Sequence, residues 1–239
     1  MSRQGTARLA GALYLAMGLP GAFALIAFPR FFLVAGDAKA TAGRIAAAPG
    51  LYRFSVFADL MCAVFAIWMV MVLYDLFKDV HRGHARLMVG FALGMVAIGL
   101  VNTVLMAAPL VLTSGAGYLT TFDKHQLDAL TLGFLGLRSQ GLHVATMYWG
   151  LWLLPLGILT YRSGCLPRVL GVLVVIAGCT YVADSVAYYF LPEYARMIAN
   201  ASTLPQALGE VGFTGWLLIK GVRADPIAHR PSGSGNRVA

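Results

Sequence analysis

Six apolar segments alternate with short polar segments along the chain, and this alternation predicts the fold. The apolar segments run over residues 9–29, 54–77, 87–112, 140–160, 168–191 and 204–221. Each is close to the roughly 20 residues that a helix needs to cross a hydrocarbon core about 30 Å thick. Because backbone polar groups in a bilayer must pair within their own segment, we expect each segment to be a helix. The pattern therefore predicts an all-α bundle of six transmembrane spans.

The polar connections add three expectations. A short surface helix is predicted over residues 37–48, and an amphipathic segment over 123–138 leads into the fourth span. Residues 1–222 are expected to form one transmembrane domain. Residues 223–239 contain Pro, Gly, Ser and basic residues, so they are predicted to be a disordered, basic, cytoplasmic tail.

Small residues inside the segments predict close contacts between helices. Gly90 and Gly94 form one such pair in the third segment, and Gly209 and Gly212 form another in the sixth. Pro20 predicts a kink in the first segment.

Composition agrees with a membrane protein. Hydrophobic residues make up 59% of the chain and charged residues only 12%, against about 25% charged residues in soluble domains. The net charge of +8 does not indicate nucleic-acid binding, because the basic residues are scattered among the loops. With both termini placed in the cytoplasm, eleven of the 18 Lys and Arg residues fall inside and seven outside, Arg138 among the seven. This bias predicts a multi-pass protein of a bacterial inner membrane with the lipid bilayer as its partner.

Polar side chains within the spans are the candidates for function, since such groups are costly in lipid. They are Asp59, Asn102, His143, Asp184 and Glu210, one in each of the second to sixth spans. The helical rise of about 1.5 Å per residue places the three carboxyl groups roughly 9–11 Å below the outer boundary. We therefore expect a polar layer in the outer half of the bilayer.

Helical spacing adds two residues to this layer. Gln206 lies one turn before Glu210, and Tyr181 shares a face with Asp184. The seven side chains are predicted to line a pocket that opens to the outside and binds or moves a small cationic or protonatable molecule. Because three nearby carboxylates repel one another, either one is protonated or a cation neutralises them: Arg138, a metal ion or the ligand.

Two alternatives remain open. In the first, the polar layer is structural and the protein is a non-catalytic membrane partner or assembly subunit. In the second, the carboxyl groups act as acid and base in an intramembrane enzyme whose substrate is a lipid or an isoprenoid. His143 is the only histidine within a span, and the sequence contains no HExxH, Cys-x-x-Cys, P-loop or Gly-x-Ser-x-Gly motif. These observations predict no metal, cofactor or nucleic-acid partner and favour a non-enzyme, and no catalytic residue is identified.

Several stretches resemble a known family. They are YRSGCLPRVLG at 161–171 with YVADS at 181–185, TARLAGALY at 6–14, LYRF at 51–54 followed by Ala58 and Asp59, and GEVGFTGWLLIKG at 209–221. In these stretches the chain resembles the DUF4386-like family of uncharacterised bacterial multi-pass membrane proteins, over roughly residues 6–222. The resemblance implies the six-span architecture, and it supplies no activity.

Overall fold

The computed structural model describes residues 2–223, and within them every regular element is a helix. The elements are α1 (Arg3–Ala22), the π-helical turn η1 (Phe23–Ala27), α2 (Phe28–Phe32), α3 (Ala38–Ala47), α4 (Pro49–Phe77), α5 (Arg82–Leu112), the 3₁₀ turn η2 (Gly117–Thr121), α6 (Lys124–Arg162), α7 (Arg168–Phe190) and α8 (Pro192–Ile219). Of the tail predicted over 223–239, residues 224–239 lie outside the described part of the chain.

The structure confirms an all-α protein with membrane-spanning capacity. Five helical stretches are long and apolar enough to cross a bilayer: the continuous α1–η1–α2 helix, α4, α5, α6 and α7. Helix α8, which contains the sixth predicted span, is not among these five within residues 2–223. It carries Gln206 and Glu210 between its apolar residues, and both side chains lower its hydropathy.

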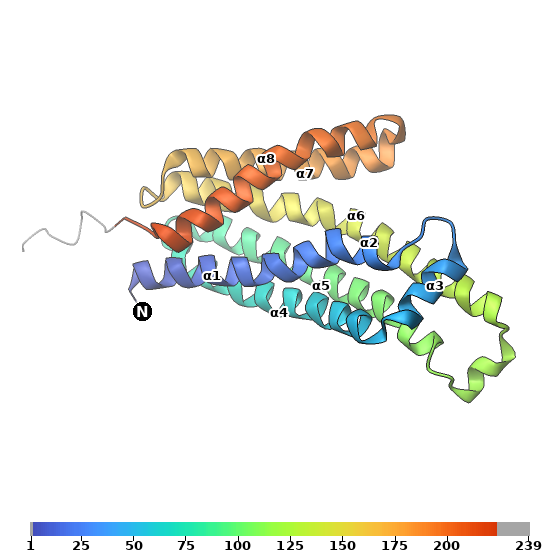
Figure 1. The fold of residues 1–239 in the computed structure, drawn as a ribbon. Helices are drawn as coiled ribbons and strands as arrows, with labels where there is room; N and C mark the ends of the chain where they lie inside the picture. Colours follow the sequence, from blue (N-terminus) through green and yellow to red (C-terminus); the bar gives the residue numbers. More distant parts are fainter. Residues whose placement is uncertain (1, 224–239) are drawn as a thin grey trace, which may run out of the picture.

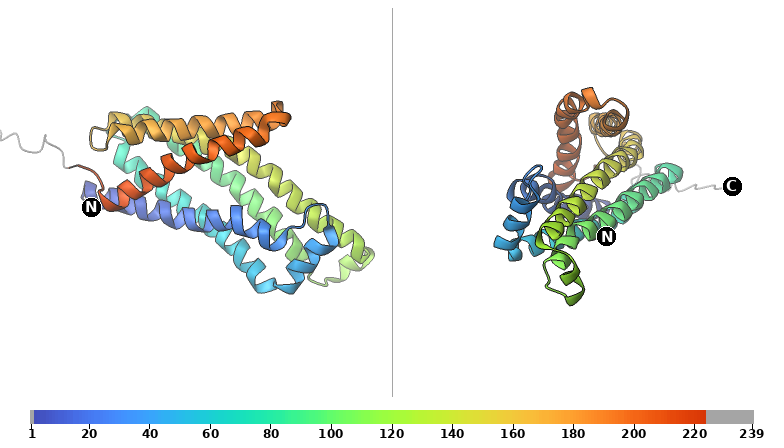
Figure 2. Two further views of the ribbon diagram at one scale, coloured as in Figure 1. Left: turned by 45° about the horizontal axis from the view of Figure 1, so that its top comes forward. Right: turned by 90° about the vertical axis from the view of Figure 1, so that its right-hand side faces the viewer.

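The long helices pack as a closed ring (Figures 1 and 2). Helix α1 packs against α4 and α8, and the ring closes through the neighbouring pairs α4–α5, α5–α6, α6–α7 and α7–α8. The left panel of Figure 2 shows α8 (red) reaching the start of α1 (blue). There the Gln4 amide nitrogen donates to the Lys220 carbonyl at 2.9 Å, and its oxygen accepts from the Val222 N–H at 2.9 Å. The first and last helices therefore meet at one end of the bundle.

The long helices carry large apolar side chains both inside the bundle and on its outer surface. Trp152, Met69 and Leu73 are among the fully buried side chains. On the outside, Trp68 is 54% exposed and Val104 is 70% exposed. Large apolar side chains that cover the outer surface of a bundle are expected where the surrounding solvent is lipid.

The first predicted surface helix is confirmed, and one predicted loop position is wrong. Helix α3 begins after Asp37, whose carboxylate accepts the Ala40 N–H at 2.8 Å. Helix α6 starts at a capping box formed by Asp123 and Gln126 and continues for 39 residues. Arg138, placed in an outer loop by the sequence analysis, lies inside this helix and is only 4% exposed. No proline interrupts residues 124–154, so the amphipathic segment and the fourth span form one helix.

Glycines set the closest helix contacts. A Cβ on Gly94 would meet the Tyr148 ring, and one on Gly209 would meet Ala177 and the Leu173 carbonyl, as the sequence predicts; Gly90 has nothing nearby. Two further pairs, which the sequence analysis did not identify, join α6 to α7: Gly150 faces Gly178 and Gly157 faces Gly171. Their seven-residue spacing in each helix brings the two backbones together twice. The irregularity expected at Pro20 is the π-helical turn η1, which begins three residues later.

Candidate functional site

Glu210 is held by two phenols from two other helices. Its Oε2 atom accepts the Tyr14 hydroxyl of α1 at 2.7 Å, and its Oε1 atom accepts the Tyr181 hydroxyl of α7 at 2.6 Å. One turn earlier on α8, the side-chain nitrogen of Gln206 is buried and has no hydrogen-bond partner among the described residues. We call Glu210, Tyr14, Tyr181 and Gln206 the Glu210 centre.

Tyr14 was not predicted as a site residue. It is 4% exposed, and its ring packs 5.8 Å from Trp152 and 6.3 Å from Phe213 between ring centroids. On α1, Gly11 allows this approach, because a Cβ there would lie 2.9 Å from the backbone nitrogen of Leu218 on α8. The sequence feature that could have identified Tyr14 is its phenol group, which lies one turn after Ala10 and Gly11 in an apolar helix.

Asp59 belongs to a different set of contacts. Its Oδ2 atom accepts the Thr103 hydroxyl of α5 at 2.6 Å, and its Oδ1 atom lies 3.8 Å from Arg138 Nη2 of α6. The Arg138 guanidinium also lies 5.1 Å from the centroid of the Phe28 ring. Tyr52, on the Phe28 side of this site, donates its hydroxyl to the Met106 carbonyl at 2.7 Å.

Asn102 lies at the same helix interface. It is 3% exposed and packs against Gly141, where a Cβ would overlap its Oδ1 atom. Its side-chain nitrogen is buried and has no hydrogen-bond partner among residues 2–223. We call Asp59, Thr103, Arg138 and Asn102 the Arg138 centre.

His143 and Asp184 form a third set of contacts between α6 and α7. The His143 ring stacks on Tyr188 with centroids 3.5 Å apart and planes inclined by 10°. Asp184 is half-buried and interacts electrostatically with His143. Tyr188 donates its hydroxyl to Gln140 Oε1 at 3.0 Å. We call His143, Asp184, Tyr188 and Gln140 the His143 centre.

The seven predicted residues thus occur in three groups of contacts instead of one. Tyr181 donates to Glu210, which lies one turn from Gln206 on α8, and Asp184 interacts electrostatically with His143. Asp59 contacts Thr103, the residue after Asn102 on α5, whereas Asn102 itself packs against Gly141. The Glu210 and His143 centres share α7, where Tyr181 and Asp184 lie one turn apart. Arg138, one of the cations that the sequence analysis considered, lies 3.8 Å from Asp59 without a hydrogen bond between the two side chains. Within residues 2–223, no group of three or more His, Cys, Asp and Glu side chains is placed to hold a metal ion.

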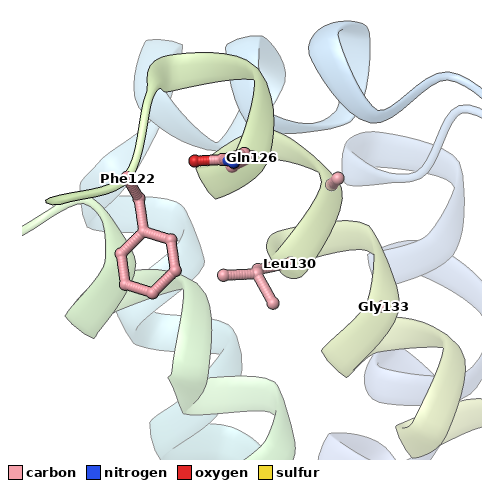
Figure 3. A pocket seen from close by; sticks show the side chains of 5 residues that line it. Phe122, Gln126, Leu130 and Gly133 are labelled. Atoms are coloured by element: carbon pink, nitrogen blue, oxygen red, sulfur yellow. The ribbon is translucent and has the colours of Figure 1, made fainter.

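A surface hollow lies elsewhere, on the first turns of α6. It is lined by Phe122, Gln126, Ala129, Leu130 and Gly133. Figure 3 shows the Phe122 ring and the Leu130 side chain projecting toward each other across it. It contains none of the predicted site residues.

Comparisons with known proteins define the family and no activity. The family model described as a domain of unknown function, DUF4386, matches residues 9–221, which confirms the resemblance. An uncharacterized protein of Archaeoglobus fulgidus is 33% identical over 90 residues, which make up 38% of this chain and 52% of that relative. The chain therefore spans about half the length of that relative. No solved structure matches the chain significantly.

Proposed function

The chain belongs to the DUF4386 family, and we propose that it is a six-span protein of the bacterial inner membrane that binds or moves a small cationic or protonatable molecule. The family assignment and the five apolar helices support a multi-pass membrane protein. The six-span topology and the ligand are our proposals.

The position of α8 supports a sixth span. It contains 28 residues and runs from the turn after α7 to the start of α1, where Lys220 contacts Gln4. At about 1.5 Å per residue its length is about 42 Å, enough to cross a bilayer. Its polar side chains Glu210 and Gln206 contribute to the Glu210 centre instead of facing lipid.

The single observation that carries the ligand proposal is the bonding of Glu210. A carboxylate oxygen has about two acceptor sites, and each oxygen of Glu210 uses one for a phenol. One acceptor site on each oxygen remains for an N–H group of a ligand. Carboxyl groups inside membrane bundles commonly mark substrate or ion pathways. A cation or a protonatable amine is the chemistry that such a site recognises.

The test measures binding by the purified protein in a neutral detergent. Tetraethylammonium, an aromatic amine and a polyamine are titrated at several pH values while the melting temperature is followed. We expect at least one of these probes to raise the melting temperature of the wild type and to lose its effect in Glu210→Gln. Glu193→Gln is the matched control, because Glu193 lies exposed in the first turn of the same helix. No response from the wild type to any probe at any pH would overturn the proposal.

One observation favours the alternative of a structural layer in an assembly subunit. Asp59 and Glu210 already accept hydrogen bonds from other helices of the same chain. If Glu210→Gln melts far below the wild type and no cation binds, the layer holds the helices together. Gentle solubilisation should then retain a partner protein in a fixed ratio.

A further inference from the structure

The Arg138 centre contains buried hydrogen-bond donors that have no acceptor among the described residues. An arginine carries five N–H donors and no acceptor. Both Nε and Nη2 of Arg138 are buried and make no hydrogen bond within residues 2–223. The 3.8 Å between Nη2 and Asp59 Oδ1 is longer than the roughly 2.7–2.9 Å of a charge-assisted hydrogen bond. The guanidinium is thus buried with only a loose partner, an arrangement that is costly in a membrane protein.

Asn102 adds a donor to the same interface. Its side-chain nitrogen is buried without a partner, while its oxygen packs against Gly141. Gly141 follows Arg138 by three residues on α6, so the two side chains lie within about one helical turn of each other. The buried side-chain atoms without a hydrogen-bond partner in this centre, Arg138 Nε, Arg138 Nη2 and Asn102 Nδ2, are all nitrogen donors.

Asp59 leaves the guanidinium available. Its carboxylate already accepts the Thr103 hydroxyl at 2.6 Å, so it has a close donor besides Arg138. A second acceptor can therefore bond to Arg138 without leaving Asp59 unpaired.

The surroundings of the guanidinium are buried and aromatic. Phe28 covers the guanidinium, and Phe32 and Tyr52 pack on Phe28 with centroids 5.3 and 5.6 Å away. Phe28 follows directly after the π-helical turn η1, and such turns occur frequently at functional sites. The planar fork of a guanidinium matches the geometry of carboxylate and phosphate groups, and a buried aromatic environment strengthens such a bond.

From these contacts we propose that Arg138 and Asn102 bind an oxyanion, a carboxylate or phosphate group, at the interface of α4, α5 and α6. The oxyanion accepts from the Arg138 Nε and Nη2 fork and from the Asn102 nitrogen. The source is either the head group of an amphiphile or a free anion. This site goes beyond the proposed function, because it uses a different centre and the opposite ligand charge.

The test titrates decanoate, dodecyl phosphate and inorganic phosphate into the purified full chain in a neutral detergent, with sodium chloride holding the ionic strength constant. Binding is followed by melting temperature and by native mass spectrometry. We expect saturable binding by the wild type. If decanoate and dodecyl phosphate bind and inorganic phosphate does not, the ligand is lipid-like. If all three bind, the oxyanion group alone is sufficient for binding. Absence of binding by all three overturns the proposal.

Variants separate the site from general anion binding. Arg138→Gln should weaken binding roughly tenfold or more, since it removes a charged hydrogen-bond donor. Arg138→Lys keeps the charge and loses the fork, and Asn102→Ala loses one donor, so both should also weaken binding. Asp59→Asn removes the competing carboxylate and should strengthen it. Arg53→Gln, at an exposed position on α4, should bind as the wild type does.

These variants keep the test decisive if Arg138→Gln fails to fold. Unchanged affinity in Arg138→Lys together with Asn102→Ala would overturn the assignment, as would weaker binding by Asp59→Asn. The probes here are anions and those for the Glu210 centre are cations. A negative result for one proposal therefore does not decide the other.

Discussion

At the scale of single residues, the informative contact is one carboxylate shared by two phenols. Tyr14 and Tyr181 come from opposite parts of the sequence, and both donate to Glu210. Interhelical hydrogen bonds in membrane proteins contribute about 0.6 kcal/mol on average. The two phenols, however, donate to the same carboxylate, so their contributions to stability are coupled. When one hydrogen bond is lost, the carboxylate depends more strongly on the other.

We therefore predict non-additive effects at this carboxylate. Tyr14→Phe and Tyr181→Phe should each lower the free energy of unfolding by about 0.6 kcal/mol. The double variant should lose more than the sum, since Glu210 then has neither phenol. Reversible unfolding of the four proteins in mixed detergent micelles measures the coupling. Tyr194→Phe, at a residue that is 51% exposed, is the control, and additivity within about 0.3–0.5 kcal/mol would contradict the prediction.

The sequence predicts the types of polar residue better than their partners. Position within an apolar run distinguishes Asp59 and Glu210 as carboxyl groups of largely apolar helices without any coordinates. Their donors Thr103 and Tyr14 cannot be found in this way, because the sequence does not say which helices are neighbours. The burial of Arg138 was not predicted for a related reason: the residue lies between the amphipathic segment and the fourth predicted span, and its burial depends on α2, α4 and α5 packing around α6.

At the scale of helices, hydrophobic runs predict the long elements well and their lengths poorly. Five predicted spans correspond to helices that are apolar enough to cross a bilayer, and Asp37 marks the start of α3 as a cap. The fourth span was predicted to begin at residue 140, where the polar residues give way to apolar ones. Helix α6 begins much earlier, at Lys124. A change from lipid to water does not by itself end a helix, and α6 ends only at Arg162, just before Gly164 with its positive φ and Pro167.

The contact between α6 and α7 gives a prediction at this scale. A Cβ on Gly157 would lie 2.8 Å from the Gly171 carbonyl oxygen and 2.6 Å from the Val175 side chain. Gly157→Ala should therefore force the helices apart and lower the free energy of unfolding by about 1–3 kcal/mol. Thermal unfolding in detergent tests this directly.

Gly90→Ala on α5 provides the matched control. A Cβ there meets nothing within 4 Å, so the substitution should be neutral or raise stability slightly through helix propensity. An equal loss of stability at both positions would show that the contact between α6 and α7 is not what makes Gly157 necessary.

At the scale of the whole molecule, the closed ring of helices fixes the relation of the termini. Arg223 donates its backbone N–H to the Cys165 carbonyl at 2.9 Å, and Gln4 bonds to Lys220 and Val222. The end of α8, the turn between α6 and α7, and the start of α1 therefore meet at one end of the bundle, with α3 at the other (Figure 1). With Arg138 inside α6, six of the seven basic residues assigned to the outer side remain in exposed positions there. The excess of positive charge at the end with the termini increases accordingly.

This arrangement predicts that α8 crosses the membrane and that both termini face the cytoplasm. In a chain whose three cysteines are replaced, Ser2→Cys, Lys39→Cys and Arg223→Cys are introduced singly at exposed positions. A membrane-impermeant maleimide should label Lys39→Cys in intact spheroplasts, and should label the other two only after lysis. A chain with five spans would instead give opposite labelling at Ser2 and Arg223. Common labelling of these two positions from outside would keep the six spans and reverse the orientation, so that the polar centres would lie in the cytoplasmic half of the bilayer.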